Sequence, residues 1–200
     1  MRKNKGVLLI VSGPSGAGKS TVIGRVAQLR DDMRFSVSVT TRPPREGEKD
    51  GVHYYFRTLE QFRDMVKTDT FLEYAEYSGG SYGTPAAPVD ESLADGYCVV
   101  LDIEVQGAAQ VMEKRKDVVS VFLCPPSPEE LERRLRGRGT DTEEKIRERL
   151  TAARREYGQV HKYDYIVIND NADQAVKELD AIITAARCRS NIILEGEPLI

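Results

Sequence analysis

A glycine-rich loop near the N-terminus constrains the fold of this chain more than any other feature. The apolar run Val7–Val11 predicts a buried strand, and the segment Gly13–Thr21 that follows matches the pattern G-x-x-x-x-G-K-S/T. Glycines let such a loop curl so that successive backbone N–H groups point at a phosphate, at the positive end of the next helix. A helix is expected over Thr21–Leu29, so the motif predicts an α/β fold with a phosphate-binding loop.

The side chains of this loop have separate expected roles. Lys19 would bridge the β- and γ-oxygens of a nucleoside triphosphate, and the Ser20 hydroxyl would ligate Mg²⁺. The alternative, a glycine-rich turn that contains Lys-Ser by chance, is disfavoured by the strand and helix signals on either side. The residues expected to bind the triphosphate are Gly13, Pro14, Ser15, Gly16, Ala17, Gly18, Lys19, Ser20 and Thr21.

The rest of the chain alternates short apolar runs with amphipathic segments, the pattern of βαβ units in a mostly parallel sheet that is covered on both faces. Further strands are expected at Tyr97–Leu101, Val118–Leu123 and Tyr165–Ile168. Further helices are expected at Val105–Glu113, Pro128–Arg136, Glu143–Tyr157 and Ala172–Ala186. The predicted fold class is therefore α/β, with a parallel sheet flanked by helices.

Composition excludes several classes of function. A formal net charge of -3 over 200 residues gives no overall positive field for duplex nucleic acid. The 3 cysteines form no C-x-x-C pair, so neither a disulfide framework nor a zinc site is indicated. The apolar run Val7–Val11 is far shorter than a membrane-spanning helix requires. We expect a cytoplasmic protein with no nucleic-acid or membrane partner; whether it is a monomer or a homo-oligomer stays open.

Two segments interrupt the alternation. Residues 36–96 contain extended stretches and one short helix, Leu59–Val66, and are interpreted as an insertion with its own small sheet. Residues 128–160 are densely charged and contain the flexible sequence Arg136–Gly139 between two helices, which suggests a mobile lid. The predicted organisation is a core of 1–35, 97–127 and 161–188, an acceptor-binding insertion at 36–96, a lid at 128–160 and a tail at 189–200.

The first insertion contains residues suited to a phosphate monoester. Arg42 and Arg45 lie on a chain stiffened by Pro43 and Pro44, and Tyr54 follows. Forked guanidinium groups give bidentate hydrogen bonds to phosphate oxygens, and a phenol adds a directional O–H. Solvated arginines on a surface loop remain the alternative for this segment taken alone.

Carboxylates near the ends of strands could read a base. Glu73 is flanked by apolar residues at strand spacing, and a carboxylate can accept hydrogen bonds from both N1–H and the exocyclic amine of guanine. The hydroxyls of Ser38 and Thr84 could donate to O6 and N7 of the same base; an exposed strand position for Glu73 is equally compatible with the spacing. Asp102 ends a buried strand, where a Walker B carboxylate lies, although such a residue is also an ordinary helix cap.

These motifs together resemble the guanylate kinase family over about Val7 to Arg187. The similar segments are Ser12–Thr21, Ser36–Glu48, Tyr82–Thr84, Leu101–Gly107, Arg136–Thr140 and Ile166–Asp170. The resemblance implies GMP binding by Ser38, Arg42, Arg45, Glu48, Tyr54, Glu73, Tyr82, Thr84 and Asp102. It implies ATP binding by Arg134, Arg138 and Asn169 besides the phosphate loop, and catalysis by Lys19, Arg42, Asp102, Arg138 and Arg149.

Two positions depart from the family pattern. Ser81 stands where a second tyrosine is common, and Glu104 where aspartate is common, which bears on rate or affinity more than on reaction type. The role of Asp102 is open, because sheet geometry favours a water of the metal while the resemblance favours the acceptor nucleotide.

The resemblance implies Mg²⁺-dependent transfer of the γ-phosphoryl group of ATP to GMP and dGMP, giving ADP and GDP in purine metabolism and GMP recycling. A second hypothesis is a catalytically inactive guanylate-kinase-like module that binds phosphopeptides, which the intact Gly18-Lys19-Ser20 disfavours. A third is a nucleoside triphosphatase whose acceptor is water, which the paired Arg42 and Arg45 disfavour.

Overall fold

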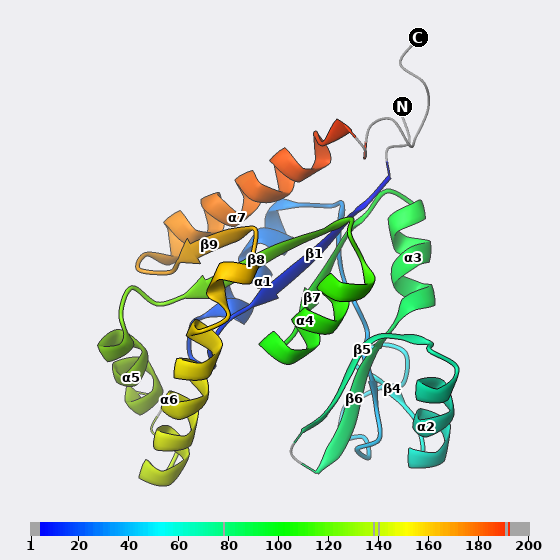
Figure 1. Ribbon diagram of the computed structural model, residues 1–200, viewed down its shortest axis with the longest axis horizontal. Coiled ribbons are helices and arrows are strands. Elements are labelled where there is room, and N and C mark those ends of the chain that lie inside the picture. Colours follow the sequence, from blue (N-terminus) through cyan, green and yellow to red (C-terminus); the bar gives the residue numbers. More distant parts are fainter. Residues whose placement is uncertain (1–4, 78, 138, 140, 191, 193–200) are drawn as a thin grey trace.

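A five-stranded parallel sheet forms the centre of the molecule (Figure 1). The computed structural model describes residues 5–77, 79–137, 139, 141–190 and 192. The strand order is β2-β7-β1-β8-β9, and every neighbouring pair is parallel. The strands are β1 Val7–Ser12, β2 Met33–Phe35, β7 Cys98–Asp102, β8 Val118–Cys124 and β9 Tyr165–Ile168. The predicted fold class is thereby confirmed.

The sheet is buried on both faces because side chains alternate along each strand. On one face, Val7, Leu9 and Val11 of β1 pack with α1 (Lys19–Leu29) and α7 (Ala172–Arg187). On the other, Leu8 and Ile10 pack with α3 (Ala86–Ala94) and α4 (Val105–Lys114). All six residues of β1 are buried, which is why its sequence is continuously apolar until Ser12.

A second, mixed sheet of order β4-β3-β6-β5 lies at the end of the first where α4 begins (Figure 1). Its strands are β3 Val39–Thr40, β4 Tyr55–Phe56, β5 Phe71–Tyr77 and β6 Gly80–Pro85. The helix α2 (Leu59–Lys67) covers it, with the ring of Phe62 4.8 Å from that of Phe71. A capping box of Thr58 and Gln61 starts this helix.

Two further helices, α5 (Pro128–Gly137) and α6 (Glu143–Tyr157), project from the same end of the parallel sheet (Figure 1). They pack against each other through Leu131, Leu135, Ile146 and Ala153. A short 3₁₀ helix, η1 (Val160–Lys162), leads from α6 to β9. Because ligands of open α/β sheets bind at the carboxyl ends of the strands, the region between the mixed sheet and α5/α6 is where a site is expected.

Besides η1, the structure adds three elements to those predicted. β2 is a three-residue edge strand that is mostly exposed, so it carries no apolar pattern. β6 is rich in glycine and hydroxyl residues, which are poor strand signals, yet it pairs along its whole length with β5. α3 was not predicted because Pro88 interrupts its sequence; the proline lies in the first turn, where a helix tolerates it. Val89 and Leu93 of α3 pack on the parallel sheet.

Candidate active site

The phosphate loop has the shape that its sequence predicts. Gly13 and Gly18 adopt φ values of 141° and 93°, which other residues rarely reach. A Cβ atom on Gly13 would also lie 1.9 Å from the carbonyl oxygen of Leu123. The loop leads directly into α1, and Nζ of Lys19 donates a 2.5 Å hydrogen bond to the Gly13 carbonyl. The ammonium group is therefore held across the mouth of the loop.

Two residues expected to bind ATP support this loop from the side. The buried Asn169 donates from Nδ2 to the Ala17 carbonyl at 2.8 Å. A Cβ atom on Gly18 would come within 2.4 Å of that same Nδ2, so this position of Asn169 requires glycine at residue 18. Arg134 donates to the backbone oxygen of Asn169 at 2.8 Å and is paired with Glu130 at 2.7 Å. Both residues thus fix the loop in position, whatever else they contact.

Oxygen donors suited to Mg²⁺ meet at the start of α1. Asp102, at the end of β7, lies level with Val11 of β1, and its carboxylate is close enough to Ser20 to interact with the hydroxyl. Desolvation raises the pKa of Asp102, while Lys19 and the Ser20 hydroxyl act in the opposite direction. No set of three or more His, Cys, Asp or Glu side chains arranged for a metal ion occurs in the described part of the chain. A hydroxyl and a carboxylate are nevertheless enough for Mg²⁺, which keeps several waters and takes the rest of its ligands from phosphates.

A cavity of about 380 Å³ opens between the mixed sheet and the start of α4. Five of the residues expected to bind GMP line it together: Ser38, Tyr54, Glu73, Tyr82 and Asp102. The same cavity is lined by residues that the sequence did not single out as binding residues, namely Ala75, Glu76, Ile103, Glu104, Gln106 and Gly107. The only available signal for the α4 residues was their place in the run Leu101–Gly107, directly after the strand that ends in Asp102.

Glu73 is a buried carboxylate inside this cavity. It is 7% exposed, and the Thr84 hydroxyl donates a 2.6 Å hydrogen bond to its Oε1. Burial raises the pKa of Glu73, and the bond from Thr84 lowers it in part. Thr84 itself is buried behind Glu73, so its hydroxyl proton is engaged there. Spacing alone left an exposed strand position for Glu73 open, and the structure excludes it.

The arginine segment forms a compact charged cluster next to the cavity. Arg42 makes a bidentate pair with Glu48, at 2.9 and 2.8 Å. The Arg42 guanidinium lies 5.4 Å from the ring centre of Tyr54, whose ring meets that of Tyr82 edge-on at 6.1 Å. Hydrogen bonds from Arg42 and from the Arg45 backbone hold the pKa of Glu48 down, to about 2. The cluster fixes Arg42, whereas the Arg45 side chain is exposed.

The helix α6 contributes to the site from the opposite side. Arg149 donates a 2.7 Å hydrogen bond to Oγ of Ser15 in the phosphate loop and lies 3.5 Å from Asp141. At the end of α6, the half-buried Glu156 interacts electrostatically with Lys19 and Glu104, and desolvation raises its pKa. Arg138, expected to act in catalysis and ATP binding, lies outside the described residues.

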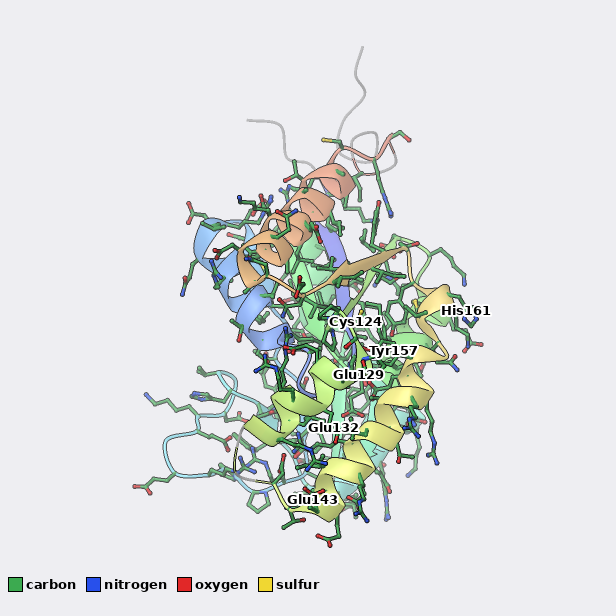
Figure 2. The ribbon with its side chains drawn as sticks, turned by 90° about the vertical axis from the view of Figure 1, so that its left-hand side faces the viewer. Cys124, Glu129, Glu132, Glu143, Tyr157 and His161 are labelled. Carbon is green, nitrogen blue, oxygen red and sulfur yellow. The ribbon has the colours of Figure 1, made fainter. Side chains whose placement is uncertain are left out.

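The same helix is anchored to the parallel sheet at its C-terminal end. Figure 2 shows Tyr157, at the end of α6, beside Cys124, at the end of β8. The Tyr157 ring also packs 5.8 Å from that of Phe122, and burial raises the pKa of its hydroxyl to about 12. Glu132 and Glu143, labelled on α5 and α6, are both ion-paired to Arg136. These contacts tie α5 and α6 to each other and to the core.

The two departures noted in the sequence lie in different places. Glu104 is the N-cap residue of α4 and lines the cavity. Ser81 is buried in β6, where its backbone N–H donates to the Thr41 hydroxyl at 2.9 Å. None of the described helices is both long and apolar enough to cross a membrane.

Comparisons with known proteins identify a family for this chain. The family model described as guanylate kinase matches residues 5–186. The chain is 46% identical to a guanylate kinase of Clostridium perfringens (strain SM101 / Type A) over 195 residues, which are 98% of this chain and 90% of that protein. It is 48% identical over 179 residues to a guanylate kinase of Synechococcus sp. (strain JA-3-3Ab), covering 90% of this chain and 82% of the relative.

A solved structure is similar over nearly the same length. The crystal structure of guanylate kinase from Anaplasma phagocytophilum superposes with a TM-score of 0.74 at 33% identity, covering 96% of this chain and 92% of that one. Sequence, fold and site geometry therefore lead to one conclusion: the chain belongs to the guanylate kinase family.

Proposed function

We propose that this guanylate kinase holds ATP and GMP head to head, with the triphosphate on the glycine-rich loop and GMP in the cavity next to α4. The observation that carries this proposal is the buried Glu73, a carboxylate in a cavity that opens beside Asp102 and the phosphate loop. The phosphoryl transfer from ATP to GMP gives ADP and GDP. dGMP would serve as well, because the proposed contacts involve base and phosphate and not the 2′-hydroxyl.

Glu73 selects the base in this proposal. Its carboxylate would accept hydrogen bonds from N1–H and from the exocyclic amine of guanine, an edge that adenine lacks. With the wrong base, the buried carboxylate would be left without partners, at a cost of about 1–3 kcal/mol or more. The Ser38 hydroxyl, on the same cavity wall, is suited to an acceptor atom of the base.

Positive groups from three elements would hold the two phosphate chains. Arg42, fixed by Glu48 and with its guanidinium 5.4 Å from the ring centre of Tyr54, would face the GMP phosphate. Lys19 faces the triphosphate, and Arg149 approaches it from α6. No general base is required, because a phosphate monoester has a second pKa near 6 and is largely dianionic at neutral pH. The rate acceleration is therefore expected to come from aligning the two substrates and neutralising the charge of their phosphates.

Ser20 would hold Mg²⁺ directly and Asp102 would hold one of its waters, and the ion would neutralise charge on the β- and γ-phosphates. We further propose that residues 36–96 and 128–160 close over the substrates and exclude water, which would otherwise compete as acceptor. We also propose a cytoplasmic location, where ATP and GMP are available.

A coupled assay of ADP release tests the proposal. Turnover is measured with GMP, dGMP, AMP, UMP, CMP and no acceptor, with and without Mg²⁺. We expect ADP release only with GMP or dGMP and only with Mg²⁺. Release without an acceptor would identify a nucleoside triphosphatase, and no release with any acceptor would identify an inactive binding module.

A further inference from the structure

Gly107, in the first turn of α4, lies against the Glu73 carboxylate. A Cβ atom on Gly107 would lie 2.7 Å from Oε2 of Glu73 and 3.2 Å from its Cδ. A contact below 3.0 Å forces one of the two groups to shift, so the Glu73 carboxylate can occupy its present position only because residue 107 has no side chain. The backbone of Gly107 does not otherwise require glycine, because it lies inside a regular helix.

The helix cannot easily retreat to make room. Gln110 donates from Nε2 to the Tyr74 carbonyl at 3.0 Å and accepts from the Tyr74 N–H at 3.1 Å through Oε1. One turn further on, Lys114 donates to the Phe71 carbonyl at 2.8 Å. Residues 107, 110 and 114 share one face of α4, as helical periodicity requires. That face is therefore fixed along β5 on both sides of Glu73.

The carboxylate is held from the other side by Thr84, whose hydroxyl donates to Oε1 at 2.6 Å. Glu73 is thus enclosed between a hydroxyl on β6 and a helix face that leaves room for one oxygen atom. A methyl group at position 107 would displace the far end of the Glu73 side chain, because this is the part that can move. The displaced carboxylate would lose either the bond from Thr84 or its position toward the cavity.

We infer that Gly107 is a specificity-determining position of the acceptor pocket: its missing side chain sets where the Glu73 carboxylate stands and thereby how well guanine is distinguished from other bases. Gly107 is a positioning residue in this account, since it acts through Glu73. The inference rests on the proposed function, in which Glu73 reads the guanine edge.

The test is the variant Gly107→Ala, with Gly24→Ala as its matched control. Gly24 also lies within a helix, α1, and a Cβ atom there would meet nothing within 4 Å. For Gly107→Ala we expect the KM for GMP to rise by about tenfold, with kcat and the KM for ATP little changed. The preference for GMP over inosine monophosphate, which lacks the exocyclic amine, should fall by a similar factor. Gly24→Ala should change none of these.

Folding is checked separately. Alanine is the better helix former, so Gly24→Ala should melt at or above the temperature of the parent protein. Gly107→Ala gains the same helix propensity but displaces the buried Glu73 carboxylate, so a cooperative melting transition, and not a raised melting temperature, is the criterion that it is folded. A Gly107→Ala protein that is folded and binds GMP with unchanged KM and unchanged preference over inosine monophosphate would overturn the inference.

A second pair of variants shows whether the effect passes through Glu73. In Glu73→Asp the carboxylate is one methylene shorter and withdraws from α4, so adding Gly107→Ala to it should change the KM for GMP by less than about twofold. If Gly107→Ala raises the KM for GMP by the same factor in the parent protein and in Glu73→Asp, the inference is overturned while the proposed function stays intact. If Glu73→Asp and Glu73→Ala leave the KM for GMP unchanged, the proposed reading of guanine fails and the inference fails with it.

Discussion

The Thr84 hydroxyl donates a 2.6 Å hydrogen bond to Oε1 of Glu73, and both side chains are buried. The two residues lie opposite each other on β6 and β5, so the pairing of the mixed sheet brings them together. A buried carboxylate needs such a donor, because an unpaired charge in the interior is costly. Thr84 is therefore expected to act on GMP through Glu73.

Replacing Thr84 by valine tests this relationship. Valine has the same shape without the hydroxyl, so Glu73 loses its buried donor, at a cost of about 1–3 kcal/mol. We expect the KM for GMP to rise by about tenfold with little change in the KM for ATP. Thr84→Ser keeps the hydroxyl and should stay within about threefold of the parent. Equal KM values for the valine and serine variants would contradict the assignment.

The buried Glu73 should make stability depend on pH in an unusual direction. Burial raises the pKa of Glu73 above that of an unfolded glutamate, near 4.3. Between the two pKa values the folded protein binds more protons, so the free energy of unfolding contributed by this group falls as pH rises. The destabilisation by the buried Glu73 charge is fully present at pH values above the pKa that Glu73 has in the folded protein. Glu73→Gln removes the charge and should be more stable than the parent at neutral pH, with the difference shrinking toward pH values below about 4.

Urea unfolding of the parent and Glu73→Gln across this pH range measures the effect. Glu46→Gln, at an exposed position of the same insertion, serves as the control. A stability difference between Glu73→Gln and the parent that does not vary with pH would show that desolvation of the carboxylate is not its cause. The gain in stability should accompany a loss of GMP turnover, since the amide of glutamine replaces one acceptor oxygen by an NH₂ donor, which cannot pair with the two parallel donors of guanine.

Arg42→Ala should separate acceptor binding from donor binding. It removes the guanidinium that Glu48 and the tyrosine rings hold next to the cavity. Bidentate, charge-assisted hydrogen bonds to a phosphate are among the strongest that side chains make, so we expect kcat/KM for GMP to fall by about 100-fold. The Kd for ATP, measured by calorimetry, should be unchanged. Arg63→Ala on the exposed face of α2 is the control. Unchanged GMP kinetics for Arg42→Ala would show that Arg42 does not bind the GMP phosphate.

Arg149→Ala should act mainly on the chemical step. Arg149 reaches the phosphate loop from α6 through Ser15, which places its guanidinium beside the expected triphosphate. Removing a preorganised group that stabilises developing charge costs about 100- to 1000-fold in kcat. The KM for GMP should change little. Arg147→Ala, exposed on the same helix, should behave as the parent protein. If Arg149→Ala changes only the KM for GMP, Arg149 does not act on the chemical step.

The Mg²⁺ requirement should depend on Ser20. If its hydroxyl is a ligand, Ser20→Ala should need a higher Mg²⁺ concentration for half-maximal turnover, by about tenfold, while Ser20→Thr should not. Chelation with EDTA should stop turnover in all three proteins without changing their melting temperature in the absence of nucleotide. An unchanged Mg²⁺ requirement in Ser20→Ala would remove Ser20 from the metal site.

Local patterns in the sequence were sufficient for the phosphate loop and the parallel sheet. Gly13, Gly18 and Lys19 follow a buried strand at fixed spacing, and the physical demands on them come from the backbone of that one segment. The same holds for the strands β1 and β8, whose burial on both faces makes them mostly hydrophobic.

Only the tertiary structure decided how distant residues support one another. Asn169 lies beside Ala17, Arg149 beside Ser15, Thr84 beside Glu73 and Gly107 beside Glu73, and each pair joins different elements. A sequence pattern reports what one segment needs along its own helix or strand. It does not report which residue of another helix or strand will contact that segment, or where a missing side chain will leave room for a neighbouring atom. Those contacts depend on how the helices and sheets pack.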